Sequence, residues 1–382
     1  MSSAVINASR LREARLYRRM TMEELADSVG INKQAISQFE NSKTSPEPFT
    51  LKRIADVLDF PYSFFAQRDT PMVTGNTYFR ALYSSSRKDL IAQELKTRYL
   101  AQIFVILKEK LIVPSLDLPS LPGRSSIEEI AQYVRKAWDL NDYPITNMVA
   151  LLEQHGVVVG EFATEGREID AFYQYNEINK EAVYCVVLGT DKSSFFRRQF
   201  NCAHELGHIL LHERYEDLGE LSREDYRKRE DQANAFAAAF LMPGTTFGRD
   251  VSIFPNRLSH YVELKRKWGV SMAAMIMRAR SLDMITPNQY TYLMRQMSSK
   301  GYRTLEPLDL DVKYRHPKVL RQSVEKLIVS NTLTGHQLLQ YIANRGLSLS
   351  PSALGELLNM NYRLFEEPVE ESNILLFPSP NR

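Results

Sequence analysis

Residues 201–212 read NCAHELGHILLH, and the two histidines four residues apart constrain the fold of this chain most strongly. In an α-helix, residues i and i+4 lie on one face about one turn apart, so His204 and His208 point the same way only if this stretch is helical. Two imidazoles on one helix face can share a metal ion, and Glu205 can reach a water molecule at that metal. The sequence therefore predicts a metal-binding helix, with His204 and His208 as ligands and Glu205 as general base.

A catalytic zinc site needs a third protein ligand and keeps its fourth position for water. His212 is eight residues after His204, about 6 Å beyond His208 by the helical rise, so three bonds from one straight helix to one ion would be strained. Glu230 is better placed, because it lies on a separate predicted helix whose apolar side can pack against the first. Asn234, four residues later on the same face, is predicted to accept the outer N–H of a metal-bound histidine. His212 is then expected beside the site or at the surface.

A second motif lies near the start of the chain, in residues 21–46. Thr21 and Glu24 form a capping box that begins a helix, Gly30 supplies a tight turn, and Asn32 can cap a second helix. Two short helices joined by such a turn match the DNA-binding helix-turn-helix, whose second helix lies in the major groove.

The side chains of the second helix predict how duplex DNA would be read. The residues expected to reach base edges are Lys33, Gln34, Ser37 and Gln38, because glutamine pairs with adenine and lysine reaches guanine or phosphate. Asn41 and Lys43 follow this helix and suit phosphate oxygens. Domains of this kind usually bind two half-sites as dimers, so a homodimer is expected. The alternative interpretation is a small helical bundle with a polar face.

The pattern of the whole chain predicts an α+β, mostly helical fold with a small sheet. Apolar runs at 157–162, 170–175 and 182–189 read as strands, and the last two flank a polar turn and predict a hairpin. We expect that hairpin to present an edge strand to an extended substrate. The predicted units are an all-α helix-turn-helix domain at 1–70, a helical linker at 71–124, a metal-binding domain at 125–305 and a helical C-terminal region at 306–382. Tyr173 and Tyr175 could line a cleft, but are interpreted as ordinary strand residues.

Composition excludes several classes of protein. The 382 residues are 44% hydrophobic and carry a formal net charge of +2, so nucleic-acid binding must come from a local surface. Only two cysteines, Cys185 and Cys202, are present, which argues against a disulfide framework and favours a reducing cytoplasm. The N-terminus has no apolar signal region, and no run approaches eighteen apolar residues, so we expect no membrane contact.

The pairing of HELGHILLH with E-x-x-A-N-x-F-A-x-x-F-L-M-P, which begins at Glu230, resembles the ImmA/IrrE family of metallopeptidases over roughly residues 125–305. Residues 7–66 resemble the Cro/repressor-like (XRE-type) helix-turn-helix family, which often precedes this peptidase. The resemblance implies a zincin-like domain, Zn²⁺ held by His204, His208 and Glu230, and catalysis by Glu205. It also implies a protein substrate, since better-understood members of the family cleave transcriptional repressors.

The main hypothesis is therefore a DNA-binding transcriptional regulator fused to a zinc-dependent endopeptidase that cleaves a repressor or partner protein. One alternative is a regulator whose zinc domain senses a small molecule or metal without cutting. Another is an antitoxin-like or phage-type protein that uses this domain only to bind a partner. All three hypotheses include DNA binding by the N-terminal domain.

Overall fold

The computed structural model describes residues 6–79, 86–123, 125–163, 170–190, 194–215 and 221–367. The fold is α+β and mostly helical, as the sequence predicts, and its described part contains one small sheet. None of the helices within these ranges is long and apolar enough to cross a membrane. Cys185 and Cys202 are both buried, and no disulfide joins them.

The sheet contains four strands in the order β1-β3-β4-β2. They are β1 (Met72–Phe79), β2 (Val158–Phe162), β3 (Ala171–Ile178) and β4 (Glu181–Gly189). β3 pairs antiparallel with both β1 and β4, whereas β2 runs parallel to β4. Asn179 and Lys180 join β3 to β4 with φ of 52° and 67°, the left-handed conformation that a two-residue hairpin turn requires. The predicted hairpin is thus confirmed.

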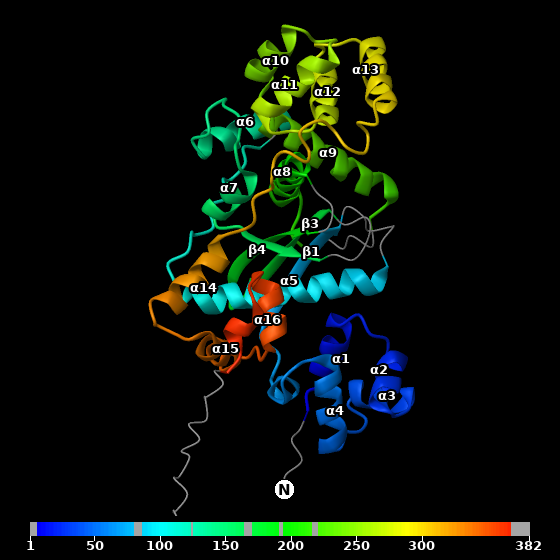
Figure 1. Ribbon diagram of the computed structural model, residues 1–382, viewed down its shortest axis with the longest axis vertical. Helices are drawn as coiled ribbons and strands as arrows, with labels where there is room; N and C mark the ends of the chain where they lie inside the picture. The colour runs from blue at the N-terminus through cyan, green and yellow to red at the C-terminus, as the bar shows by residue number, and fades with distance from the viewer. Residues whose placement is uncertain are drawn as a thin grey trace, which may run out of the picture.

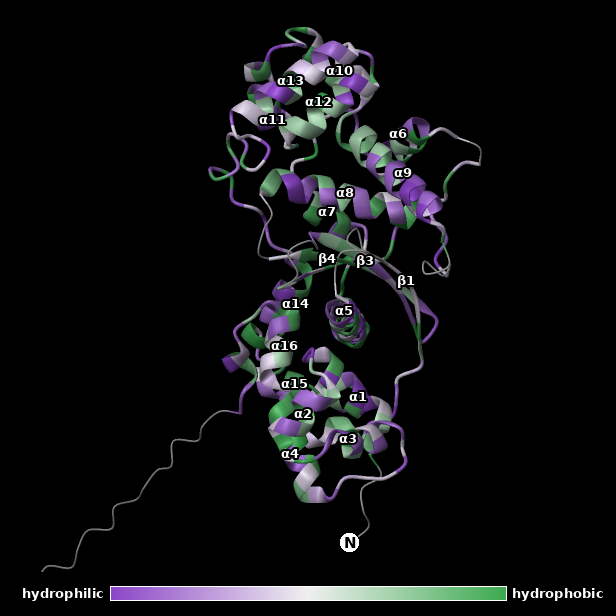
Figure 2. Cartoon of the chain, turned by 90° about the vertical axis from the view of Figure 1, so that its right-hand side faces the viewer, coloured by the Kyte–Doolittle hydropathy of each residue, from purple (hydrophilic) through white to green (hydrophobic). Residues whose placement is uncertain are grey.

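Alternate side chains of the strands enter two different hydrophobic cores. Phe172 and Val187 belong to one core, while Tyr173 and Val186 belong to the other, because successive strand residues point to opposite faces. The helix α5 (Arg87–Lys108) contributes Tyr99, Ile103 and Leu107 to the first core. Figure 2 looks along α5 and shows the sheet on one side of it and the N- and C-terminal helices on the other.

Helices that follow α5 in sequence build the second core on the opposite face. They are α6 (Ile127–Ala137), α7 (Met148–Gln154), α8 (Phe195–Leu211), α9 (Arg223–Leu241), α10 (Gly244–Ser252), α11 (Leu258–Trp268), α12 (Met272–Ser281) and α13 (Pro287–Ser299). Figure 1 shows α7 and α8 next to the sheet, with α9 and the later helices stacked beyond them. At the start of α6, Ser126 and Glu129 form a capping box.

The N-terminal helices confirm the predicted helix-turn-helix. They are α1 (Ala8–Tyr17), α2 (Met22–Val29), α3 (Lys33–Glu40), α4 (Pro48–Leu58) and the short 3₁₀ helix η1 (Tyr62–Ala66). Thr21 and Glu24 form the capping box of α2, Gly30 ends it with φ of 71°, and the Asn32 side chain caps α3. The residues that the sequence predicts to form the turn between α2 and α3, Gly30 and Asn32, therefore do so.

A buried ion pair that the sequence did not predict ties α1 to α3. The Arg15 guanidinium donates to both carboxylate oxygens of Glu40 at 2.6 and 2.7 Å. Removing one partner of a buried pair leaves the other charge uncompensated. We expect Glu40→Met to lower the free energy of unfolding by about 3–5 kcal/mol, measured by urea denaturation of the full chain.

The matched control is Arg321→Met, which breaks the exposed Arg321–Glu325 pair and should cost about 1 kcal/mol or less. The double variant Arg15→Met with Glu40→Met should recover most of the loss, because no charge is then stranded. Equal destabilisation by Glu40→Met and Arg321→Met would contradict a structural role for the buried pair.

The C-terminal region is helical, with α14 (Val319–Val329), α15 (Gly335–Ala343), α16 (Pro351–Leu358) and the 3₁₀ helix η2 (Tyr362–Phe365). These helices pack against the N-terminal helices and against α5 within one continuous hydrophobic core, and α16 also contacts β2. Gln67 donates to the Ala343 carbonyl at 2.8 Å, and its own side-chain carbonyl accepts from the Ser348 amide at 2.7 Å. The C-terminal helices therefore bridge the N-terminal helices to the rest of the chain.

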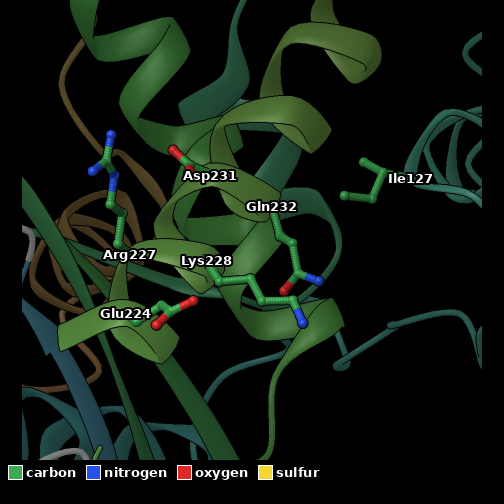
Figure 3. Close-up of a pocket in the computed structure, with 6 residues that line it drawn as sticks. All are labelled: Ile127, Glu224, Arg227, Lys228, Asp231 and Gln232. Carbon is green, nitrogen blue, oxygen red and sulfur yellow. The ribbon is translucent and has the colours of Figure 1, made fainter. Parts of the chain in front are cut away.

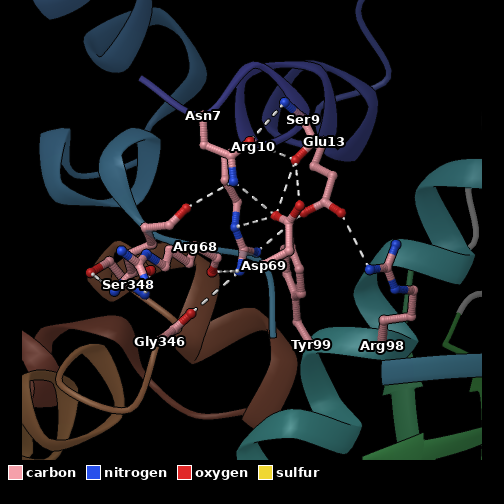
Figure 4. Close-up of polar contacts among 11 residues, drawn as sticks. Asn7, Ser9, Arg10, Glu13, Arg68, Asp69, Arg98, Tyr99, Gly346 and Ser348 are labelled. Atoms are coloured by element: carbon pink, nitrogen blue, oxygen red, sulfur yellow. Dashed lines mark hydrogen bonds and ion pairs between the residues drawn. The ribbon is translucent and has the colours of Figure 1, made fainter. Parts of the chain in front are cut away.

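Polar contacts reinforce the junction between α1 and α5. The Glu13 carboxylate accepts from the Tyr99 hydroxyl at 3.0 Å and lies 3.3 Å from the Arg98 guanidinium. Arg10 is almost fully buried and donates to the carbonyls of Arg68 and, at 3.5 Å, Gly346. Figure 4 shows these groups converging from three parts of the chain. The helix-turn-helix is thus held against α5 and the C-terminal helices by side chains from all three.

The predicted helical linker at 71–124 contains α5, but residues 72–79 form the strand β1, so helix is wrong for this part. The partner of β1 lies about a hundred residues later in the sequence, so no local pattern reveals the pairing. A Cβ atom at Gly75 would lie 2.4 Å from the Arg214 carbonyl oxygen, so glycine permits a close approach there.

Candidate metal centre and nucleic-acid interface

The HELGH stretch lies in α8, which packs on α9, and Gly207 sits at their contact. A Cβ atom at Gly207 would lie 3.2 Å from the backbone of Ala233 and 3.1 Å from the Phe236 ring. The absence of a side chain therefore lets the two helices approach closely between the two histidines. This close approach brings Glu230 of α9 to the histidine face of α8.

Three ligand-type side chains meet at this point. The Nε2 atoms of His204 and His208 are 3.0 Å apart, and they lie 3.4 and 3.3 Å from the two carboxylate oxygens of Glu230. Tetrahedral zinc with bonds of about 2.0–2.1 Å separates its ligand atoms by about 3.3 Å. The spacing and the donor types of this trio therefore fit a metal ion.

The hydrogen bonds behind the histidines decide where their lone pairs point. The Asn234 side-chain carbonyl lies 3.0 Å from His204 Nδ1, and because this oxygen can only accept, His204 carries its proton on Nδ1. A neutral imidazole has one N–H, which leaves the His204 Nε2 lone pair directed toward His208 and Glu230.

His208 has a different neighbour behind it. Its Nδ1 lies 3.0 Å from His212 Nδ1, and His212 Nε2 lies 3.2 Å from the side-chain carbonyl of Gln232. His212 is not in the convergent trio, which agrees with the prediction that it lies beside the site.

Burial sets the charge states of these groups. Burial lowers the pKa of His208 to about 3 and that of His212 to about 4, so both rings are neutral near pH 7. Burial alone would raise the pKa of Glu230, but its side-chain contacts with His204 and His208 outweigh this effect and hold that pKa well below its usual value. Within the trio, His208 thus presents a neutral imidazole and Glu230 an ionised carboxylate, the protonation states that metal ligands need.

The two histidines of the trio, on α8, are buried, whereas Glu230, on α9, is partly exposed to solvent. His204 and His208 are each 1% exposed, whereas the Glu230 side chain is 15% exposed. Glu205 is 2% exposed and lies next to His204 on α8. Tyr173 of β3 stacks on His208 with ring centroids 6.1 Å apart, whereas the Tyr175 hydroxyl bonds to Glu177. Of the two tyrosines, Tyr173 is the one beside the trio.

A cavity of about 630 Å³ is lined by residues of α8, α9 and α12. Its lining includes Asn201, one turn before His204, and Asn234, which supports His204. Asn201 is 6% exposed, and its Nδ2 has no hydrogen-bond partner among the residues that the structure describes. The apolar part of the lining includes Ala238 and Met277. The cavity therefore offers an apolar wall and a buried donor close to the trio.

The hairpin does not offer the edge strand that the sequence predicts, and that expectation is wrong. β1 covers β3 and β2 covers β4, so the open edges of the sheet belong to β1 and β2. Tyr78 of β1 pairs opposite Tyr173, the residue that stacks on His208. β1 is therefore the edge strand on the side of the trio.

The six residues predicted to contact DNA lie together on one surface of the helix-turn-helix. Lys33, Gln34, Asn41 and Lys43 are exposed, and Ser37 and Gln38 are half-buried. Ile36 and Glu40 face inward, so the helix α3 presents the predicted side outward. Lys33 lies 3.4 Å from Glu23, and Asn41 donates to the Ser37 carbonyl at 2.7 Å.

Sequence reasoning missed three side chains near the trio. Gln232 contacts His212, Asn201 lines the cavity, and Tyr173 was interpreted only as a strand residue. The spacing of four between His208 and His212 was a usable signal, because it places both on one helix face. Nothing in the local sequence marks Gln232 or Asn201.

Comparison with known families agrees with both motifs. Residues 152–280 match the family model of the IrrE N-terminal-like domain, Peptidase_M78, and residues 11–65 match that of a helix-turn-helix. The trio and Glu205 all lie within the first match. The chain thus carries a metallopeptidase-like domain, of a family that implies a metal, behind a DNA-binding domain of transcription regulators.

A curated relative resembles a short part of the chain. It is the uncharacterized HTH-type transcriptional regulator RghRB of Bacillus subtilis (strain 168), 45% identical over 53 residues. The match covers 14% of this chain and 38% of that protein. The chain therefore spans little more than a third of the length of this relative.

Proposed function

We propose that this chain, which joins an XRE-type helix-turn-helix domain to an IrrE N-terminal-like peptidase domain, is a DNA-binding regulator that cleaves a partner protein with a zinc centre. One observation carries the proposal. Two histidines and a glutamate converge within hydrogen-bonding distance of one another, and Glu205 follows His204 on the same helix. Two imidazole lone pairs 3.0 Å apart repel each other unless a cation lies between them, so a divalent metal ion is the natural occupant.

In this proposal His204, His208 and Glu230 hold Zn²⁺. Nitrogen and carboxylate ligands in a set of three are typical of catalytic zinc, which leaves one position for water or substrate. When bound, zinc would act as a Lewis acid on the scissile carbonyl and on the attacking water. The low exposure of both histidines keeps bulk water away from their side of the ion.

The proton transfers fall to Glu205. Its carboxylate takes a proton from the attacking water as the water adds to the carbonyl carbon. The same group then gives that proton to the amide nitrogen as the C–N bond breaks, which releases a free amine and a carboxylate. Glu205 is not one of the three ligand-type residues of the trio, so binding the metal does not occupy its carboxylate.

The substrate would lie beside β1 and the helices α8 and α9. An extended segment can add to the open edge of β1 through main-chain hydrogen bonds. A side chain next to the cleaved bond would enter the cavity lined by Ala238 and Met277, and Asn201 Nδ2 is available to a substrate carbonyl. An extended protein segment, such as an exposed loop of a repressor, fits this arrangement better than a small molecule does.

The DNA-binding domain would bring the centre to a promoter where the target protein is bound. Because the helix-turn-helix is docked on α5 and the C-terminal helices, the two units would move together. The exposed side of α3 remains available to a major groove in this docked state. A homodimer would place two such helices on two half-sites.

Substitutions on α3 should separate base reading from phosphate binding. We expect Gln34→Ala or Gln38→Ala to relax sequence preference and weaken specific binding by about 1–3 kcal/mol, the value of one bidentate base contact. Lys43→Ala should weaken all sequences alike and lower the salt slope by about one. Footprinting and titrations at several salt concentrations measure both effects.

Lys300→Ala, an exposed change far from α3, is the control and should leave the footprint intact. A footprint that none of the three α3-region substitutions alters would show that another surface binds DNA.

Cleavage itself is tested with purified zinc-loaded protein and purified candidate repressors encoded nearby. We expect fragments whose masses define one cut site, and no fragments after a chelator removes the metal. A partner that binds tightly, with no cleavage at any ratio of enzyme to partner, would favour the sensing or partner-binding alternatives.

A further inference from the structure

We propose that His212 and Gln232 act as a positioning pair that fixes the tautomer of His208, so that His208 always presents the lone pair of Nε2 to the metal. This inference rests on the proposed zinc site. It gives a role to His212, which is the i+8 histidine of the HELGHILLH stretch but not a member of the ligand trio.

A chain of contacts leads from Gln232 through His212 to His208. A side-chain carbonyl oxygen can only accept a hydrogen bond, so the 3.2 Å contact with Gln232 places the proton of His212 on Nε2. A neutral His212 then has a lone pair on Nδ1. That nitrogen faces Nδ1 of His208 at 3.0 Å, so His208 must donate there and carry its single proton on Nδ1. The lone pair of His208 is left on Nε2, toward His204 and Glu230.

The same geometry excludes His212 as a ligand. Its Nδ1 contacts the Nδ1 side of the His208 ring, whereas the trio meets at the Nε2 side. The His208 ring therefore stands between His212 and the place where the three ligand atoms converge. His212 can influence the metal only through His208.

The two histidine ligands are thus supported in different ways. Asn234 accepts directly from His204, while His208 depends on a chain of two residues. Glu230, Gln232 and Asn234 all come from α9, so one helix supplies a ligand and orients both histidines. Figure 3 shows Gln232 on α9 beside a surface hollow lined by Lys228 and Asp231. A partner or substrate that contacts this hollow could reach the Gln232 side chain.

The test measures zinc affinity of the full chain by competition with a chromogenic chelator. Partners that orient metal-bound histidines typically contribute about 10–100-fold in affinity. We expect His212→Ala and Gln232→Met each to lose roughly that factor. His212→Asn should stay close to wild type, because its carbonyl oxygen can take the place of Nδ1 as acceptor, and Gln232→Glu should do so because it keeps an acceptor.

Lys228→Met is the matched control, since it places the same residue one turn earlier on the exposed side of α9 and should leave affinity unchanged. Thermal unfolding of every variant separates loss of the fold from loss of affinity. If His212 served only in packing, His212→Asn would lose zinc affinity as His212→Ala does, and that result would overturn the proposal. Wild-type affinity in both His212→Ala and Gln232→Met would overturn it as well.

Imidazole ¹⁵N shifts of the metal-free protein supply a readout that does not depend on zinc. Wild type should show His208 as the Nδ1–H tautomer, and His212→Ala should show a mixture of both tautomers. A mixture already present in wild type would contradict the relay even if zinc binds. Conversely, a fixed tautomer in a protein that binds no zinc would leave the relay intact and reject the proposed metal site.

Discussion

Glu205→Gln should retain zinc, fold and DNA binding but lose cleavage of the partner protein by a factor of about 10²–10⁴. The three proposed ligands do not include Glu205, so zinc retention does not depend on it. Glutamine keeps the shape and polarity of the side chain but cannot take a proton from water. The loss should therefore appear in the rate of peptide-bond cleavage and in nothing that only requires binding.

The measurement is the initial rate of fragment formation at saturating partner, with zinc content determined on the same samples. Glu224→Gln on the exposed side of α9 is the matched control and should cleave at the wild-type rate. A promoter reporter gives the cellular counterpart. A normal reporter response from Glu205→Gln, with the partner protein intact throughout, would reject the peptidase proposal and leave the domain as a sensor or scaffold.

Glu230→Ala and His204→Ala should each empty the metal site, whereas His212→Ala should leave it filled at micromolar protein. Each of the first two removes one of three ligand atoms that lie within 4.8 Å of one another. A site with two remaining protein ligands no longer has the set that catalytic zinc requires. His212→Ala only weakens the support of His208, and a weaker site still fills when protein and metal are in excess.

Zinc content per chain, measured by mass spectrometry after desalting, decides between these outcomes. Circular dichroism of the same samples checks that the helices remain. An empty site in His212→Ala together with a full site in Glu230→Ala would show that the third ligand is His212, and would also remove the basis for its positioning role.

The sequence by itself was enough for features that depend on neighbours within one or two helical turns. The capping box of Thr21 and Glu24, the left-handed Gly30 and the shared face of His204 and His208 all follow from local hydrogen bonding and the helical period. Even Glu230 could be placed, because the apolar side of its helix had to pack against a partner and the motif pairing resembled a known family. The outward side of α3 follows from the same periodicity.

Only the tertiary structure decided which distant segments meet. β1 has an unremarkable local pattern, and it became a strand because β3 lies beside it, which also removed the edge expected of the hairpin. His212 has the spacing of a ligand, but the His208 ring lies between it and the point where the trio converges. Its other ring nitrogen contacts Gln232 on a different helix. Contacts between residues far apart in sequence depend on how the helices and strands pack, and no local propensity encodes that packing. The docking of the helix-turn-helix against Tyr99 and Ser348 is decided in the same way.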